Sequence, residues 1–200
     1  EKERKVIFEE IKMRKDSPST YVLDEIQGML YDEPLGKPLI GTYETMNSIS
    51  RGEMLGRFRE IYQPNNMILC VVGDADFDEV VKFADKNFGN LKGNLPKLKI
   101  HEKNDSKTEK RKGIDQVNLV FAYHIPKYDD SKSNVAEVLS VLMAGGMSSR
   151  LFHEIRNKRN LAYAVRGDSN INKEYAFSFI KVGTTKESIE KVKELILKEF

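Results

Sequence analysis

Residues 144–165 read Ala144-Gly-Gly-Met-Ser-Ser-Arg-Leu-Phe-His-Glu-Ile-Arg-Asn-Lys-Arg-Asn-Leu-Ala-Tyr-Ala-Val165, the most informative stretch of this 200-residue sequence. The paired glycines permit positive φ and close backbone approach, which predicts a tight turn with accessible amides. Ser148 or Ser149 is a candidate N-cap for the helix that follows. Apolar residues then recur near helical spacing with charged residues between them, and the stretch ends in an alternating apolar segment. We therefore expect a turn, an amphipathic helix and a strand.

The rest of the chain alternates between helical and strand patterns and contains no phosphate-binding glycine loop. Such a mixture, with strands that can form hairpins, predicts the α+β class instead of a series of parallel βαβ units. We expect helices over about residues 1–15, 18–30, 51–63, 77–89, 133–143 and from 186 onward, and strands over about 66–72, 116–124, 161–165 and 175–182.

Residues 92–112 differ in composition from the sequence on either side. They are rich in Lys, Asn and Asp, have few periodic apolar residues and contain Pro96. This composition predicts a linker between two domains, and a long surface loop within one domain is the alternative. We therefore divide the chain into residues 1–91, the linker 92–112 and residues 113–200. Both ends of the chain fall inside helical patterns, so we expect a piece of a longer polypeptide.

Charge and hydropathy argue against two kinds of partner. The chain has 33 Lys and Arg against 31 Asp and Glu, interleaved, so we expect no nucleic-acid partner. No apolar run approaches about 20 residues and no signal-peptide pattern is present, so we expect no membrane span.

The single cysteine, Cys70, falls in the apolar run 66–72, which predicts an inert side chain in a buried strand. With one cysteine and no possible internal disulfide, we expect a cytoplasmic protein.

Two glutamates of the first predicted helix are candidates for metal chemistry. Glu3 and Glu10 are seven residues apart, close to two helical turns, so both carboxylates point the same way. One could bind a metal ion while the other acts beside it as a catalytic acid. Composition by itself favours the alternative, that these are solvated charges on an exposed helix.

The three histidines do not form a metal site in the sequence. His101 falls in the predicted linker, and His124 ends a predicted strand with no evident partner. His153-Glu-Ile-Arg-Asn157 is close to the HExxH zinc motif, but Asn157 stands where the second histidine is required. We therefore expect no complete zinc site within these residues.

Several stretches together resemble the pitrilysin or insulinase family of zinc peptidases, the inverzincins, which includes the mitochondrial processing peptidase. The resemblance covers nearly the whole chain. It is carried, in the family's order, by Val6-Ile-Phe-Glu-Glu-Ile11, Leu35-Gly-Lys-Pro-Leu-Ile-Gly-Thr42, Tyr62-Gln-Pro-Asn-Asn-Met67, Val71-Val-Gly-Asp74 and Gly145–Val165.

The resemblance implies a fold and a set of roles. It implies two consecutive α/β-sandwich units with antiparallel-rich sheets, residues 1–91 being the back half of the first, zinc-bearing unit and 113–200 most of the second. Glu10 corresponds to the family's third zinc ligand and Glu3 to a nearby acid that supports catalysis. The glycine-rich loop implies substrate binding by Gly145, Gly146, Met147 and Ser148, with Lys173 as a further contact.

Two departures limit what the chain itself can do. The HxxEH motif, which supplies two zinc ligands and the general base, would lie upstream of Glu1. By alignment on Gly183-Thr184, the places of a substrate-contacting Arg and Tyr hold Lys173 and Lys181. Lysine lacks both the fork geometry of arginine and the hydroxyl of tyrosine.

The expected function is thus a fragment, inactive by itself, of a zinc metallopeptidase that hydrolyses peptides held in a chamber between two halves. We expect a peptide substrate and a homo- or heterodimer with a family member. The alternative is a non-catalytic structural or peptide-binding subunit of a family heterodimer, which could hold peptide by strand addition.

Overall fold

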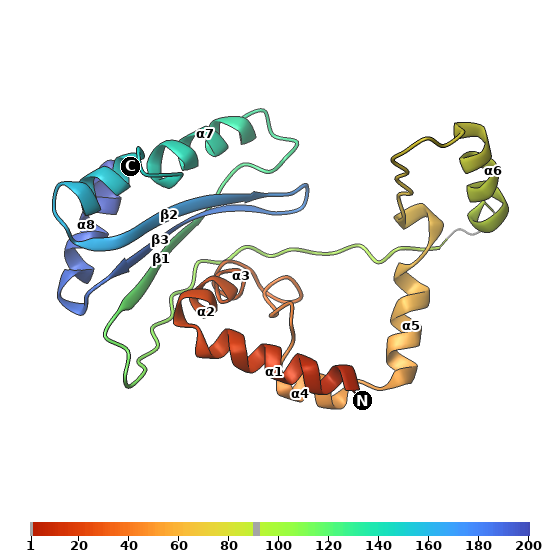
Figure 1. Ribbon diagram of the computed structural model, residues 1–200, viewed down its shortest axis with the longest axis horizontal. Coiled ribbons are helices and arrows are strands. Elements are labelled where there is room, and N and C mark those ends of the chain that lie inside the picture. The colour runs from red at the N-terminus through yellow and green to blue at the C-terminus, as the bar shows by residue number, and fades with distance from the viewer. Residues whose placement is uncertain (1, 90–92) are drawn as a thin grey trace. The chain divides into compact units, whose positions relative to one another are not determined.

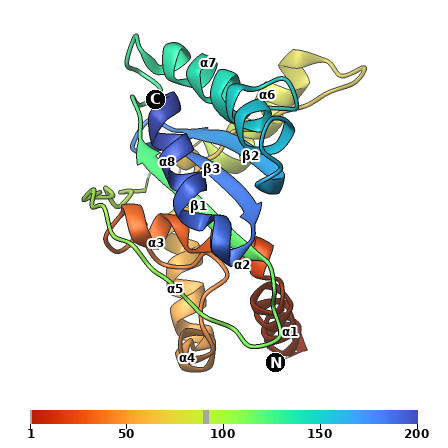
Figure 2. The ribbon, with the colours of Figure 1, turned by 90° about the vertical axis from the view of Figure 1, so that its left-hand side faces the viewer.

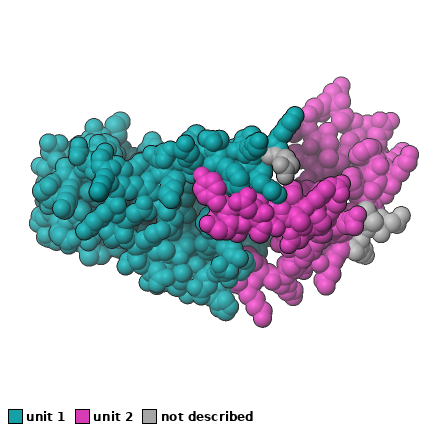
Figure 3. All heavy atoms as spheres, turned by 90° about the horizontal axis from the view of Figure 1, so that it is seen from below, with its two compact units in different colours: residues 1–41, 100–200 teal, residues 42–99 magenta. Residues whose placement is uncertain are grey.

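The computed structural model describes residues 2–89 and 93–200, and the chain forms two compact units (Figure 3). Unit 1 comprises residues 1–41 and 100–200, and unit 2 comprises residues 42–99. The predicted boundary between residues 91 and 92 lies outside the described residues. The assignment of these segments to two structural repeats stays a prediction.

Unit 1 is built on a three-stranded antiparallel sheet (Figure 1). Its strands are β1 (Val117–His124), β2 (Ala162–Ile171) and β3 (Ala176–Thr184), in the order β1-β3-β2. The hairpin β2–β3 pairs Val165 with Val182, and β1 pairs Val120 with Lys181. Helices and an antiparallel sheet in one unit confirm the predicted α+β class.

One face of this sheet carries the larger core. It is covered by α7 (Ser133–Ala144), the π-helical turn η2 (Phe152–Asn157) and α8 (Ile189–Glu199), which follows the short turn η3 (Lys186–Ser188) (Figure 2). Leu151, Ile155, Val182 and Val192 are completely buried there. Alternate residues of β3 point into this layer because successive side chains of a strand face opposite sides of the sheet.

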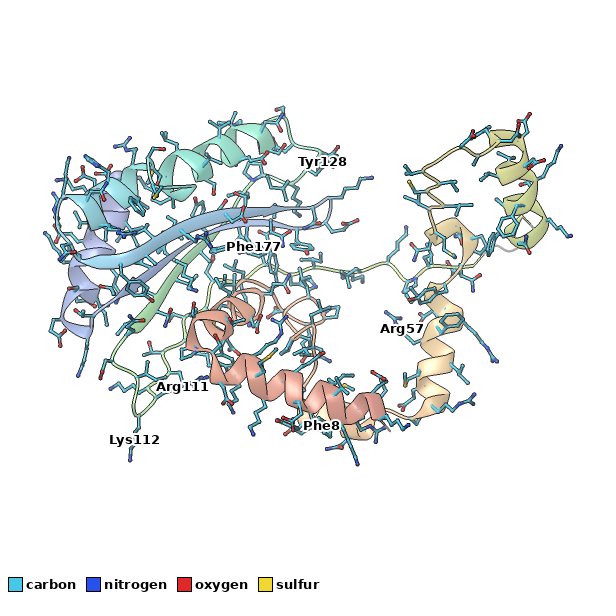
Figure 4. The ribbon with its side chains drawn as sticks, viewed as in Figure 1. Phe8, Arg57, Arg111, Lys112, Tyr128 and Phe177 are labelled. Atoms are coloured by element: carbon cyan, nitrogen blue, oxygen red, sulfur yellow. The ribbon has the colours of Figure 1, made fainter. Side chains whose placement is uncertain are left out.

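The other face of the sheet is covered by two short helices from the start of the chain, α2 (Pro18–Asp24) and α3 (Ile26–Leu30). The longer helix α1 (Lys2–Asp16) packs on α2 and has no buried residue. Tyr31 is completely buried, and its hydroxyl donates to the carbonyl of Ala176 over 3.1 Å. Phe177 of β3 packs in the same cluster (Figure 4). Residues far apart in the sequence therefore form a second, smaller core.

Part of the predicted linker, from residue 100 onward, belongs to unit 1. The amide of Lys103 donates to the carbonyl of Leu30 over 2.8 Å, and the amide of Asp32 donates to the carbonyl of His101 over 3.0 Å. Lys107 pairs with Glu25 at 2.6 Å. The backbone of this stretch thus pairs with the end of α3, and the role of residues 92–112 as a linker between two domains stays a prediction.

Unit 2 consists of helices joined by irregular chain. The helices are α4 (Tyr43–Ser48), α5 (Arg51–Ile61), η1 (Pro64–Asn66) and α6 (Phe77–Phe88). Side chains cap three of them: Thr42 caps α4, Ser50 caps α5 and Asp76 caps α6. Among residues 2–89 and 93–200, every helix is too short or too polar to cross a membrane.

The strand predicted over residues 66–72 is wrong. Residues 67–72 form no regular structure, and Ile68 and Val72 are 97% and 92% exposed. Cys70 is also exposed, contrary to the buried side chain that was expected. The described residues of unit 2 contain no strand, so within this unit the run has no neighbouring strand to pair with.

Candidate functional site

The first candidate site is the exposed surface of α1. The helix carries Glu3 in its first turn and Arg14 and Lys15 in its last turn. Charges placed in this way interact favourably with the helix dipole and stabilise the helix. Arg14 forms an ion pair with Asp24 at 2.8 Å, which links α1 to α2. Glu3 and Glu10 both lie on the solvent-exposed surface of this helix.

The two glutamates share one side of the helix but do not form a metal centre within this chain. Their seven-residue spacing separates them by about 10 Å along the axis. Across the described residues, no group of three or more His, Cys, Asp and Glu side chains is placed to hold a metal ion. A catalytic zinc ion normally has three protein ligands, so the donor set of this chain does not fit a complete site.

A hollow of about 370 Å³ beside α1 does not extend this candidate site. It is lined by Glu9, Lys12, Met13, Asp16 and Ser17, and neither Glu3 nor Glu10 belongs to its lining. The carboxylates and the ammonium group of this surface are solvated charges.

The second candidate site is the glycine corner, residues 145–148, where α7 ends. The amide of Gly145 donates to the carbonyl of Val141 over 2.9 Å, and a Cβ on Gly145 would lie 2.6 Å from the Cα of Val141. Gly145 is therefore required for close approach, whereas its φ of −76° is ordinary. Neither glycine of the pair adopts the positive φ that the residue type permits. A Cβ on Gly146 would meet nothing within 4 Å.

Ser149 closes the corner instead of capping the next helix. Its hydroxyl donates to the carbonyl of Gly146 over 2.6 Å, and the side chain is buried. No side-chain cap is present at η2, so the predicted capping role is wrong. Gly146, Met147 and Ser148 are left exposed, and the corner presents backbone and a flexible thioether to solvent.

Lys173 does not join the glycine corner. Ala144 lies against Gly167 in the middle of β2, and Lys173 follows six residues later at the tip of the β2–β3 hairpin. Six residues of strand span about 20 Å. The structure thus leaves these two predicted substrate contacts well apart.

Lys181 is used within the fold. Its ammonium group donates to the carbonyl of Ser19 over 2.6 Å, which ties β3 to α2. Burial, with a smaller contribution from Arg166, lowers the pKa of Lys181 below its ordinary value. The side chain is therefore committed to packing, a role that the sequence pattern did not indicate.

The near-match to a zinc motif at His153 is a structural turn. The carboxylate of Glu154 binds Lys158 and lies 2.6 Å from Arg159, and these hydrogen bonds lower the pKa of Glu154 to about 2. Such a carboxylate is a poor general base. His153 itself is exposed.

His124 has partners that the sequence did not reveal. Its Nε2 lies 3.0 Å from the carbonyl of Lys103, and its ring packs edge-on against Tyr31 at 5.1 Å between centroids. The Nδ1 atom is buried without a hydrogen-bond partner among the described residues. These contacts join β1, α3 and the segment after residue 100, so their evident role is in packing.

Comparison with known proteins gives a family. The model of the Peptidase M16 inactive domain matches residues 48–200. Glu3 and Glu10 lie before the matched region, and the glycine corner lies within it.

Curated relatives carry the name zinc protease. One from Rickettsia felis is 30% identical over 192 residues, covering 94% of this chain and 47% of the relative. One from Bacillus subtilis is 29% identical over 198 residues, covering 98% of this chain and 48% of the relative. The chain thus spans about half the length of the curated relatives it matches.

Solved structures share the fold. A protease from Helicobacter pylori superposes with a TM-score of 0.82 at 22% identity, over 98% of this chain and 51% of that protein. The M16 inactive domain of Pseudomonas fluorescens gives a TM-score of 0.80 at 19% identity, over 98% of this chain and 48% of that one. Sequence and fold confirm the resemblance to insulinase-type zinc peptidases: the chain belongs to the M16 family of peptidases.

Proposed function

We propose that residues 1–200 are part of a longer zinc-dependent metallopeptidase that hydrolyses peptides held in a chamber between its two halves. The observation that carries this proposal is the match to proteins named zinc proteases over nearly the whole chain. The exposed pair Glu3 and Glu10 on α1 is consistent with it, because both carboxylates are accessible and share one side of the helix.

In this proposal, Glu10 supplies one zinc ligand of the full-length protein and Glu3 supports catalysis beside it. The remaining ligands and the general base come from outside residues 1–200. A chain with one ligand cannot hold a catalytic zinc ion, so residues 1–200 by themselves are inactive.

The proposed substrate contacts lie on unit 1. Gly145, Gly146, Met147 and Ser148 would contact the peptide at the glycine corner, where backbone groups are exposed. Lys173 would make a separate contact from the tip of the hairpin. A Gly146→Ala variant of the full-length protein tests the corner, since the added methyl group has open space and leaves the fold intact. Slower peptide cleavage with unchanged thermal stability supports the role, and unchanged cleavage refutes it.

The metal assignment is tested by zinc content and peptide cleavage of the full-length protein. Glu10→Gln should lose zinc and activity together, whereas Glu3→Gln should keep zinc and lose activity. Glu9→Gln is the matched control, because Glu9 is exposed one residue away on a different side of α1. Full zinc occupancy in Glu10→Gln would refute the ligand assignment.

A second function is supported by the match of residues 48–200 to an inactive domain. The full-length protein would then be a non-catalytic structural or peptide-binding subunit, similar to a subunit of a processing peptidase, and would act as a dimer with a catalytic family member. Zinc and activity in the protein purified alone exclude this second function, and activity only after mixing with a family partner supports it. We propose a cytoplasmic location for either form, which fractionation of cells would test.

A further inference from the structure

Helix α7 turns most of its apolar residues away from the core of unit 1. Ser133, Ser140 and Ala144 are buried against the rest of the unit. Five of the seven exposed residues of α7 are apolar, since only Asn134 and Glu137 are polar. The outward apolar residues are Val135, Val138, Leu139, Val141 and Leu142.

The outward residues form one continuous surface, the α7 outer face. Val135, Val138 and Leu142 follow the spacing that places residues on one side of a helix. Their exposed fractions are 67%, 67% and 52%, and Met147 of the neighbouring glycine corner is 77% exposed. A helix that carries apolar residues on its outward side as well as on its buried side is typical of a position between two packed layers.

The size of the α7 outer face favours a partner within the same polypeptide over a second copy. The face and Met147 offer six apolar side chains, whereas a stable interface between separate proteins uses about 20–30 residues on each side. Packing within one chain does not lose the translational and rotational freedom that association costs. The zinc-protease relatives are about twice as long as this chain, so additional polypeptide is available.

We propose that the α7 outer face is covered, in the full-length protein, by an apolar helix or strand face of the same polypeptide that lies outside residues 1–200. Helix α7 is then a central helix, with the sheet of unit 1 on one side and the added layer on the other. This inference concerns packing and does not depend on zinc or on peptide hydrolysis.

Photo-crosslinking in the full-length protein tests the proposal. A benzophenone amino acid at position 138 should crosslink, within a monomer, to a peptide outside residues 1–200, which mass spectrometry identifies. The matched control places the same amino acid at position 137, about 100° around the helix and off the outer face. It should give a much weaker crosslink to that peptide.

Other crosslinking results overturn the proposal. A crosslinked dimer would assign the face to a second copy, a crosslink within residues 1–200 would assign it to this segment, and no crosslink would leave it open to solvent. If the benzophenone amino acid at position 138 prevents folding, hydroxyl-radical footprinting of the unmodified protein measures the exposure of the same side chains. Val135, Val138 and Leu142 should then be protected, and modification at the rate of exposed side chains would refute the proposal.

A substitution gives a third measurement. Val138→Lys should lower the midpoint of thermal unfolding of the full-length protein by several degrees, because it places a charge in an apolar layer. Glu137→Lys should leave the midpoint nearly unchanged. Equal, small effects of the two substitutions would also overturn the proposal, whereas loss of enzymatic activity would bear only on the proposed function.

Discussion

Unit 1 and unit 2 contain similar kinds of apolar residues, yet only unit 1 has a core. All the buried residues in the described part of the chain belong to unit 1. In unit 2, Phe58, Ile68, Val72 and Phe83 are all more than half exposed. The difference lies in layers: unit 1 has a sheet with helices on both faces, whereas the described part of unit 2 has helices without a sheet.

The helices of unit 2 are specified by local signals. Thr42 and Ser50 each form a capping box, and Asp76 accepts a hydrogen bond from the amide of Glu79 over 3.0 Å. Phe58 and Tyr62 stack one turn apart at 4.5 Å. Such contacts start and support a helix, but most helical stability in proteins comes from packing of an apolar face. The helices of unit 2 are thus defined by contacts between residues close in sequence, whereas the elements of unit 1 are also stabilised by packing in a core.

The largest effect is expected from a matched pair of isoleucines in the 200-residue chain. Ile155 is completely buried in unit 1, and Ile68 is 97% exposed in unit 2. Ile155→Ala should lower the free energy of unfolding by about 2–5 kcal/mol, since it leaves a cavity. Ile68→Ala should change it by less than about 0.5 kcal/mol. Urea denaturation measures both, and similar losses would contradict the contrast between the units.

Tyr31 should make unit 1 sensitive to alkaline pH. Burial raises the pKa of Tyr31 from 10.0 to about 12, so the folded state favours the neutral phenol. Its contribution is complete below pH 10, where folded and unfolded states are both neutral. It is lost as the pH rises from 10 to 12, because the unfolded state ionises first. This difference in pKa corresponds to about 3 kcal/mol.

Comparison with Tyr31→Phe isolates this effect from the other tyrosines. Below pH 10 the variant should be about 1 kcal/mol less stable, because the carbonyl of Ala176 loses one of its two donors and keeps the amide of Ile125. Between pH 10 and 12 the wild-type chain should lose more stability than the variant. Parallel curves of unfolding free energy against pH would show that Tyr31 is not buried in solution.

Substitution of alanine for two of the glycines should change the free energy of unfolding in opposite directions. Gly145→Ala should lower the free energy of unfolding by about 1–3 kcal/mol, because the new Cβ would lie 2.6 Å from the Cα of Val141. Gly56, in the exposed helix α5 of unit 2, has nothing within 4 Å of a built Cβ. Gly56→Ala should stabilise that helix by up to about 1 kcal/mol. Urea denaturation of both variants measures the signs, and a neutral Gly145→Ala would mean that the corner relaxes easily.

The sequence predicted the elements whose patterns are local. Strands β1 and β3 and helix α7 lie close to their predicted ranges, because alternation and helical spacing act over a few residues. Strand β2 was predicted to end at residue 165 but continues to Ile171. The family's motifs placed the glycine corner and the pair Glu3 and Glu10 on the correct kinds of element, although their roles stay predictions.

Features that depend on distant partners could not be predicted. The run 66–72 has the composition of a buried strand, but composition does not supply a neighbouring strand. Ser149 has the residue type of a helix cap, yet its hydroxyl donates to the carbonyl of Gly146. Lys181 has the residue type of a substrate contact, yet its ammonium group donates to the carbonyl of Ser19. The packing of residues 100–105 against α3 likewise depends on contacts about 70 residues apart.

The smallest effect is expected at the capping box of α5, and it tests whether local signals hold unit 2 together. The Ser50 hydroxyl accepts from the amide of Glu53 over 3.2 Å, and the Glu53 carboxylate accepts from the amide of Ser50 over 2.7 Å. Ser50→Ala should cost about 1 kcal/mol in the helix, and Ser50→Asp should restore most of it. Amide hydrogen exchange of α5 measures this opening, while the amides of β3 report unit 1. Faster exchange in α5 with β3 unchanged would show that unit 2 is held by local contacts; a change in both would mean that the two units unfold cooperatively.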